Sequence, residues 1–370
     1  MSIFLSSPDL KPIDYKGLER LFLPHQEQFV NQPALQLEGL LDAHYSSKSL
    51  VLQSGTVAFQ LLAHWFKFEV VFCQNLTFIA SIAPFVEKGA KPVFLGSGTD
   101  WNIDEIFWED VDRAMQKIKG NAAIVITHLY GNPAKAVLSW QILKEKYGDR
   151  LILIEDAAEA VGSTLKEKPV GTFGDFGVLS FNRNKIITTS GGGALLLNGE
   201  HGKRYHHGFY LATQARAQKP CYHHEELGFN WRMGDLNAQL GITQWAQLND
   251  KIKSRRANFS LYSQELGSMV FFQPEMDDAQ SNRWLTVITQ PQLLPEKAIE
   301  LLLKEGIETR MVWKPMHLQP VFRGAELISR GLESHFFNTG LCLPSGSNLK
   351  EEDVFYTIQA LKNAGLTIFS

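Results

Sequence analysis

The stretch Ser180-Phe-Asn-Arg-Asn-Lys-Ile-Ile-Thr-Thr-Ser-Gly-Gly-Gly193 decides how this sequence is interpreted. A strand-like run from Gly177 to Phe181 precedes Lys185, and a glycine cluster follows it, so the lysine is held close to backbone rather than on a solvated helix face. Upstream, the apolar run Leu151-Ile-Leu-Ile154 ends in Glu155-Asp156. A strand that ends in a carboxylate therefore precedes a strand that is followed by a lysine.

This order of residues meets the requirements of pyridoxal 5'-phosphate (PLP) chemistry. The amine of Lys185 would form a Schiff base with the cofactor aldehyde, and Asp156 would keep the pyridine nitrogen protonated, so that the ring takes up carbanion electrons. Taken singly, a lysine near glycines is usually part of a surface loop, and an aspartate after a strand is usually a helix cap. The prediction that both residues are catalytic therefore depends on their order and on the motifs around them.

Several other short motifs are spread along the chain: Ser54-Gly-Thr56, Leu76-Thr-Phe78, His128-Leu-Tyr-Gly131, Glu155-Asp-Ala-Ala-Glu-Ala-Val-Gly162, Gly174-Asp-Phe-Gly177 and Gly228-Phe-Asn-Trp-Arg-Met233. Together with the lysine stretch, and in this order, they resemble the sugar aminotransferases of the DegT/DnrJ/EryC1/StrS family, which are PLP enzymes of fold type I. The resemblance covers roughly residues 50 to 365.

The pattern of the chain from about residue 50 onward is a succession of short β-rich runs and helix-like segments. The runs are Leu50-Val-Leu52, Val70-Val-Phe72, Pro92-Val-Phe-Leu95, Ala122-Ala-Ile-Val-Ile126, Leu151-Ile-Leu-Ile154, Gly177-Val-Leu-Ser180 and Ala194-Leu-Leu-Leu197. Nearly continuous apolar strands separated by helices predict a parallel-rich sheet that is covered on both faces.

The predicted fold class is therefore α/β, and the resemblance makes it the PLP-dependent transferase fold type I, which is aspartate aminotransferase-like. We expect a large domain with a mostly parallel seven-stranded sheet and a smaller C-terminal α+β domain. The predicted boundaries are 1–35 for an N-terminal arm and short helix, 36–250 for the large PLP-binding domain and 251–370 for the small domain. Asp235 to Leu266 is predicted to form one long amphipathic helix that leaves the large domain.

Further cofactor contacts follow mainly from the resemblance. Ser54-Gly-Thr56 lies between a strand and a helical pattern, where backbone N–H groups would face an anion, although a plain helix cap is the alternative. The resemblance assigns the cofactor phosphate to Gly55, Thr56, Ser180 and Asn230, stacking on the ring to Phe78, and contact with the ring hydroxyl to Glu159. In the family the asparagine comes from the neighbouring subunit, which implies a homodimer with shared active sites.

The substrate side is indicated by the segment from Gly306 to Phe322, which looks like that of family members that aminate UDP-linked 4-keto amino sugars, the bacillosamine-type branch. Arg310 and His317 are the candidate substrate residues, with a domain-joining salt bridge for Arg310 as the competing explanation. Two departures from the family pattern, Arg183 and Gly96-Ser-Gly98, concern the identity of the sugar and not the cofactor.

The predicted activity is the transfer of an amino group, from glutamate, to a nucleotide-linked keto sugar such as a UDP-4-keto hexose, for surface polysaccharide or glycan biosynthesis. Lys185 would also act as the acid–base group that moves the proton. A dehydratase of the same family is an alternative, but His replaces the lysine in those members. A non-catalytic regulator with the PLP fold is another alternative, and no helix-turn-helix extension or basic patch supports it.

The composition is compatible with these predictions. A chain of 370 residues with 44% hydrophobic and 20% charged residues is long enough for two domains, and its net charge of −3 gives no argument for binding nucleic acid or a membrane. Cys73, Cys221 and Cys342 lack zinc-ligand spacing and suggest a reducing compartment, so neither a metal site nor a disulfide framework is predicted. Without a signal-peptide pattern or an apolar run of membrane-spanning length, we expect a cytoplasmic protein.

Overall fold

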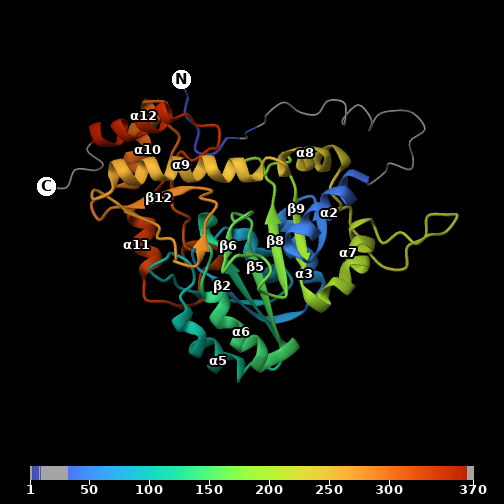
Figure 1. Ribbon diagram of the computed structural model, residues 1–370. Coiled ribbons are helices and arrows are strands. Elements are labelled where there is room, and N and C mark those ends of the chain that lie inside the picture. The colour runs from blue at the N-terminus through green and yellow to red at the C-terminus, as the bar shows by residue number, and fades with distance from the viewer. Residues whose placement is uncertain (1, 8, 10–31, 365–370) are drawn as a thin grey trace, which may run out of the picture.

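The computed structural model describes residues 2–7, 9 and 32–364, and its centre is an eight-stranded sheet (Figure 1). The strand order is β1-β9-β8-β5-β4-β2-β3-β14. Neighbouring strands are parallel except at β9, which runs antiparallel to both β1 and β8. The strands are β1 (Lys48–Leu52), β2 (Phe68–Gln74), β3 (Lys91–Leu95), β4 (Asn121–Thr127), β5 (Leu151–Asp156), β8 (Phe176–Ser180), β9 (Gly193–Leu197) and β14 (Glu326–Ile328).

Both faces of this sheet are buried, as the apolar runs predicted. Along β4, Ile124 and Ile126 belong to one hydrophobic cluster, whereas Ala123 and Val125 belong to the cluster on the opposite face. The first face is covered by α2 (Gln32–Tyr45), α5 (Trp108–Met115), α6 (Ala136–Tyr147) and α8 (Asp235–Trp245). The second face is covered by α3 (Gly55–Trp65), α4 (Ala83–Glu87) and α7 (Tyr205–Ala212). The predicted α/β class with a mostly parallel sheet is confirmed.

The C-terminal part of the chain builds a second, four-stranded sheet of order β10-β12-β15-β13. Its strands are β10 (Phe271–Phe272), β12 (Thr286–Thr289), β13 (Arg310–Met311) and β15 (Gly340–Leu343). Around it lie α9 (Leu248–Leu266), α10 (Pro295–Lys304), α11 (Leu332–Thr339) and α12 (Glu351–Asn363), of which α9, α10 and α12 lie together at the top of Figure 1. A small third sheet joins β6 (Thr164–Leu165), β7 (Lys168–Pro169) and β11 (Ala279–Gln280). The domain boundaries given above stay a prediction.

The predicted single helix from residue 235 to 266 is wrong, because the chain forms two helices with a break after α8. At Gln247, φ is −102° and ψ is 1°, which interrupts the helical backbone. The two helices pack against different parts of the molecule. A Cβ added at Gly241 of α8 would lie 2.8 Å from a methyl carbon of Leu37, so α8 packs closely on α2, whereas α9 contacts α12. One straight helix could not face both surfaces.

The prediction of seven strands is one strand short. All seven predicted runs lie in the large sheet, and β14, from the C-terminal part of the chain, pairs in parallel with the edge strand β3. This strand has only three residues, mostly exposed, and therefore carries no alternating or buried pattern. Gly96, one of the departures noted in the sequence, explains how it fits: a Cβ at Gly96 would lie 2.6 Å from Oγ of Ser329.

The predicted N-terminal arm and short helix lie mostly outside the described residues. The described beginning of the chain joins the C-terminal part, because the backbone N–H of Ile3 donates to the carbonyl of Gly306 and the N–H of Ser345 donates to the carbonyl of Leu5, at 2.9 and 2.8 Å. Within the described ranges, no helix is both long enough and apolar enough to cross a membrane.

Candidate active site

A cavity of about 270 Å³ lies where the strands of the large sheet end. Its lining comes from segments that follow the carboxyl ends of β1, β2, β4, β5 and β8, which is where ligands bind in open α/β sheets. Seven of the predicted catalytic and cofactor-binding residues line this one cavity: Gly55, Thr56, Phe78, Asp156, Glu159, Ser180 and Lys185. The fold therefore brings together residues that are up to 130 positions apart, from 55 to 185.

Lys185 lies in a turn after β8, in which its backbone N–H donates to the carbonyl of Asn182 at 2.9 Å. Its Nζ atom lies 3.4 Å from Oε1 of Glu159 and 3.9 Å from the centroid of the Trp284 ring. A carboxylate and an aromatic face both attract an ammonium group. The amine is thus held inside the cavity, with 12% of the side chain exposed.

Asp156 is the last residue of β5, and its side chain is buried. Its Oδ2 atom accepts a hydrogen bond of 2.5 Å from the hydroxyl of Ser81, and Oδ1 accepts one of 3.1 Å from the N–H of Ala158. Burial raises the pKa of Asp156, while these two hydrogen bonds and the charge of Lys185 act in the opposite direction. Each carboxylate oxygen has a further lone pair, so the group can accept from one more donor in the cavity.

Glu159 connects Lys185 to the neighbouring loop. While Oε1 faces the lysine, Oε2 accepts a hydrogen bond of 2.8 Å from the N–H of Tyr130. Tyr130 has a φ of 56°, a left-handed conformation that is uncommon outside glycine. Burial raises the pKa of Glu159, and the positive charge of Lys185 opposes this effect. Glu159, which was predicted to contact the hydroxyl group of the cofactor ring, therefore places a buried carboxyl group beside the amine of Lys185.

The start of α3 also lines the cavity. Ser54 caps this helix, because its hydroxyl accepts from the N–H of Val57 at 3.2 Å, so the cap anticipated as an alternative is present. The first N–H groups of a helix lack intrahelical partners and suit an anion. At the glycine cluster two backbone segments lie close together, because a Cβ at Gly193 would lie 2.4 Å from the nitrogen of Gly55. Thr56 and Ser180 add hydroxyl groups to the lining, and Ser180 lies beside Gly55, where an added Cβ would be 3.6 Å from Cβ of Ser180.

Asn230 is the one predicted cofactor residue that does not line the cavity of its own chain. It is exposed and forms an isolated bridge with Thr213. Between α7 and α8 the chain projects away from the body of the molecule, at the right of Figure 1. On this projection the residues Tyr222 and Leu227 are 79% and 87% exposed.

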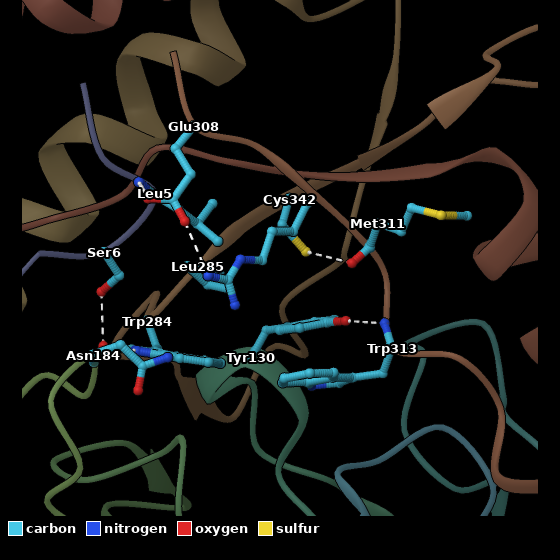
Figure 2. Close-up of a pocket in the computed structure, with 11 residues that line it drawn as sticks. Leu5, Ser6, Tyr130, Asn184, Trp284, Leu285, Glu308, Met311, Trp313 and Cys342 are labelled. Carbon is cyan, nitrogen blue, oxygen red and sulfur yellow. Dashed lines mark hydrogen bonds and ion pairs between the residues drawn. The ribbon is translucent and has the colours of Figure 1, made fainter. Parts of the chain in front are cut away.

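Arg310 lines a second, smaller cavity of about 50 Å³ (Figure 2). Its guanidinium lies 3.0 Å from Oε1 of Glu308, and 60% of the side chain is exposed. The two cavities adjoin, because Asn184, Trp284 and Trp313 line both of them. Arg310 is therefore next to the cavity that contains Lys185. Its ion pair with Glu308 joins residues only two positions apart, so this pair is not the domain-joining salt bridge considered as the competing explanation.

Three aromatic rings line the smaller cavity, and two of them, Trp284 and Trp313, also line the larger one. The ring of Tyr130 is nearly parallel to those of Trp284 and Trp313, with centroid distances of 6.3 and 6.4 Å. Figure 2 shows the three rings along one side of the smaller cavity, with Leu5, Glu308 and Cys342 on the other. The hydroxyl of Tyr130 accepts a hydrogen bond of 2.8 Å from the backbone N–H of Trp313, and this bond holds the two residues side by side.

His317, the second candidate substrate residue, lines neither cavity. Its Nδ1 atom lies 2.8 Å from Nδ2 of Asn75, and its backbone N–H donates to Oδ1 of the same asparagine at 3.1 Å. Burial lowers the pKa of His317, which favours the neutral ring. The fold thus places His317 in a local hydrogen-bond network rather than beside Lys185.

The sequence reasoning missed the residues that support the site. Glu155 accepts hydrogen bonds of 2.6 to 2.7 Å from three backbone N–H groups in residues 171–174. Its Oε2 also lies 2.9 Å from Nε2 of His128, whose Nδ1 accepts from the N–H of Ala134, so Nε2 carries the proton. Only the position of Glu155 beside Asp156 in the same motif hinted at this role. Ser81 and Trp284 had no signal that tied them to Asp156 and Lys185.

Known proteins resemble this chain over most of its length. EpsN from Bacillus subtilis (strain 168), provisionally named a pyridoxal phosphate-dependent aminotransferase, is 39% identical over 325 residues, which cover 83% of this chain and 81% of EpsN. GDP-perosamine synthase from Escherichia coli O157:H7 is 31% identical over 296 residues, which cover 79% of this chain and 78% of the synthase.

Among solved structures, Spr1654 from Streptococcus pneumoniae in its PLP form, provisionally named a sugar aminotransferase, is 21% identical and covers 100% of both chains, with a TM-score of 0.88. This likeness confirms the predicted fold. Residues 33–362 match the model of the DegT/DnrJ/EryC1/StrS aminotransferase family. With this match over most of its length, the chain belongs to the DegT/DnrJ/EryC1/StrS aminotransferase family.

Proposed function

We propose that this protein is a PLP-dependent aminotransferase that transfers the amino group of glutamate to a nucleotide-linked keto sugar. The observation that carries the proposal is one cavity that is lined by Lys185, by the buried carboxyl group of Asp156 and by the start of α3. These are an amine, an acid and a helix N-terminus, and they lie at or after the ends of three different strands, β8, β5 and β1.

The groups in the cavity suit PLP. Lys185 supplies an amine for the aldehyde, and Asp156 keeps acceptor capacity for the ring nitrogen after bonding to Ser81 and Ala158. Gly55, Thr56 and Ser180 would hold the phosphate, and Phe78, half exposed in the cavity, would flank the ring. When bound, PLP supplies a conjugated ring that stabilises negative charge on the adjacent carbon.

The side chains around the cofactor would then act on protons and charge. Lys185 would hold PLP between turnovers and, once released, its Nζ would take a proton from the substrate carbon and return it. Glu159 and the face of Trp284 would keep Nζ in place, at the distances of 3.4 and 3.9 Å given above. Asp156 would hold the charge of the ring nitrogen by a charge-assisted hydrogen bond.

We propose further that the protein is a homodimer in which Asn230 reaches the cofactor phosphate of the partner subunit. Asn230 is exposed and absent from the cavity of its own chain, which is compatible with a role across an interface. In a two-fold dimer the same contact occurs twice.

The acceptor that we propose is a UDP-linked 4-keto hexose, with Arg310 beside its diphosphate and His317 as a more remote contributor. Arg310 supports this by its position at the smaller cavity, where the Tyr130 and Trp313 rings could lie against a sugar or base. The relative named GDP-perosamine synthase makes a GDP-linked acceptor the natural competitor. A role in surface polysaccharide synthesis and a cytoplasmic location remain predictions.

The test is to mix the PLP-loaded protein with glutamate, then with UDP- or GDP-linked keto hexoses, and to follow the cofactor spectrum. Glutamate should convert the aldehyde form to the amine form, and a true acceptor should restore it. Loss of water from a sugar without any need for an amino donor would indicate the dehydratase alternative. Bound PLP that no donor and acceptor pair can cycle would favour the regulatory alternative.

A further inference from the structure

The peptide unit that joins Asn184 to Lys185 is fixed at both of its polar atoms. The carbonyl oxygen of Asn184 accepts a hydrogen bond of 2.8 Å from the hydroxyl of Ser6 and another of 2.8 Å from Nε1 of Trp284. The N–H of the same unit, which belongs to Lys185, donates to the carbonyl of Asn182 at 2.9 Å. Fixing this plane restricts φ at Lys185 and hence the direction in which its side chain leaves the backbone.

Both donors come from segments far from Lys185 in the sequence. Ser6 lies at the beginning of the chain, and Trp284 lies just before β12. In Figure 2 the hydroxyl of Ser6 and the indole of Trp284 approach Asn184 at the edge of the smaller cavity. The turn that carries the lysine is therefore held by elements of the C-terminal part of the molecule, because residues 3 to 5 are themselves bonded to that part.

Arg255, a residue of α9, connects the two donors. Its Nη2 donates to Oγ of Ser6 at 3.1 Å, and its Nη1 donates to the carbonyls of Trp284 and Ser345 at 2.5 and 2.9 Å. A guanidinium can only donate, so Oγ of Ser6 must be the acceptor in the first bond. The single hydroxyl hydrogen of Ser6 is thereby directed to the carbonyl of Asn184, and successive bonds of this kind strengthen one another.

The burial of Arg255 calls for an explanation. The residue is only 1% exposed, and its three hydrogen bonds to described residues go to neutral oxygen atoms. Burial lowers the pKa of Arg255 to about 10, so the group stays charged at neutral pH. The charge of Asp9 favours the charged form, but no carboxylate of the described residues forms an ion pair with Arg255. Burying a cation in this way costs free energy that an apolar residue would avoid. Its bonds to Ser6 and Trp284 supply a reason for its presence.

Trp284 also contacts the lysine directly, since its ring faces Nζ at 3.9 Å. The backbone N–H of Trp284 donates to Oδ1 of Asn282 at 2.8 Å, and the carbonyl of Trp284 accepts from Arg255. These two bonds fix the backbone of Trp284 and, with it, the place from which the indole extends. The same residue therefore holds the peptide before Lys185 and the end of the Lys185 side chain.

We propose that Arg255, Ser6 and Trp284 are positioning residues for Lys185: Arg255 orients the hydroxyl of Ser6 and the indole of Trp284, and these hold the Asn184 carbonyl so that the lysine amine points into the cavity. This inference rests on the proposed role of Lys185. It adds a function for the beginning of the chain, which contributes a hydroxyl group to the support of the active site.

The sharpest test compares Ser6→Ala with Ser7→Ala in the PLP-loaded, full-length protein. The two hydroxyls are adjacent, but that of Ser7 donates to Oδ1 of Asn348 and not to the lysine turn. Two quantities are measured beside thermal stability: the fraction of bound PLP that borohydride fixes on Lys185, and the rate of the glutamate half-reaction. Ser6→Ala should lower that fraction and slow the half-reaction by about 2- to 12-fold, the range for one neutral hydrogen bond.

Two further variants separate positioning from packing. Ser6→Thr keeps the hydroxyl and should restore most of the wild-type rate. Trp284→Phe keeps an aromatic ring but loses the N–H donor, so it should slow the half-reaction, whereas Trp140→Phe, an equally buried change outside the cavity, should not. Combining Ser6→Ala with Trp284→Phe leaves the carbonyl without either donor, and the combined loss should exceed the product of the single losses.

The proposal is overturned if Ser6→Ala matches Ser7→Ala in both quantities, or if Ser6→Thr is as slow as Ser6→Ala. In either case borohydride would still fix PLP on Lys185 of the wild-type protein, and the proposed function would stand. If the wild-type protein carries no PLP on Lys185, the proposed function itself is wrong, and this inference is overturned with it.

Discussion

The hydroxyl of Ser81 donates a buried hydrogen bond of 2.5 Å to Oδ2 of Asp156, which lines the cavity at the end of β5. The same hydroxyl lies 3.0 Å from Oγ1 of Thr77, which in turn lies 2.7 Å from Oγ1 of Thr127. A chain of buried hydroxyls thus fixes the carboxyl group before any ligand binds. An acid that is oriented in advance stabilises charge on its partner without having to reorganise during the reaction.

Replacing Asp156 by Ala should reduce turnover far more than cofactor binding. Without the carboxylate, the charge on the ring nitrogen loses its partner, and we expect a loss in kcat of about 10²- to 10³-fold, by analogy with other preorganised groups. The measurements are kcat and the Kd for PLP, with Asp149→Ala as an exposed control. Near-normal turnover would mean that Asp156 only caps the chain after β5.

Removing the side chain of Glu155 should destabilise the fold. The carboxylate accepts from three backbone N–H groups and from His128, and these donors, buried or partly buried, would be left without their acceptor. Losing hydrogen bonds to a charged group costs about 1.5–3 kcal/mol each, so Glu155→Ala should lower the free energy of unfolding by at least about 3 kcal/mol. Urea denaturation measures this, and the exposed Glu145→Ala serves as the control. An unchanged midpoint would contradict the interpretation.

Mixing two inactive variants should restore activity if the sites are shared. Lys185→Ala lacks the amine, and Asn230→Ala lacks the contact that we place in the partner's site. Exchange of subunits would produce heterodimers with one intact site, because both changes fall in the other site. Activity is measured after confirmed exchange, with each variant alone as the control. No recovery would show that Asn230 serves only its own chain.

Arg310→Ala should weaken use of the acceptor and leave the glutamate half-reaction nearly unchanged. Loss of a hydrogen bond to a charged group costs about 1.5–3 kcal/mol, or roughly 10- to 150-fold in kcat/KM for the nucleotide sugar. The two half-reactions are followed separately by absorbance, and Arg330→Ala, an exposed change beyond β14, is a matched control. Equal damage to both half-reactions would place Arg310 at the amino acid donor or in the support of the fold.

The large sheet could be predicted because its strands are encoded locally. β4 and β5 are short, nearly continuous apolar runs, and strands buried on both faces have this pattern. Asp156 and Lys185 could be singled out because of their order along the chain and the motifs around them, and the fold brings both to one cavity, Asp156 at the end of β5 and Lys185 in the turn after β8. The break between α8 and α9 and the strand β14 could not be predicted, since both depend on which distant surfaces those segments meet.

The support of the site was unpredictable for the same reason. Ser81 and Asp156 are 75 residues apart, and Ser6 and Asn184 are 178 residues apart. No spacing rule connects such pairs, and a serine or an arginine carries no sequence signal of what it touches. Arg255 in particular lies in a helix whose composition is typical of a solvated surface, yet the side chain is buried.

Covalent attachment of the cofactor at Lys185 is the central claim, and borohydride reduction of the PLP-loaded protein followed by peptide mass mapping tests it most directly. The reduced cofactor should be found on the peptide that contains Lys185 and on no other. Lys185→Ala should still bind PLP, because the phosphate and ring contacts remain, but it should not be labelled and should not transaminate. Labelling at any other lysine, or transamination by Lys185→Ala, would contradict this account.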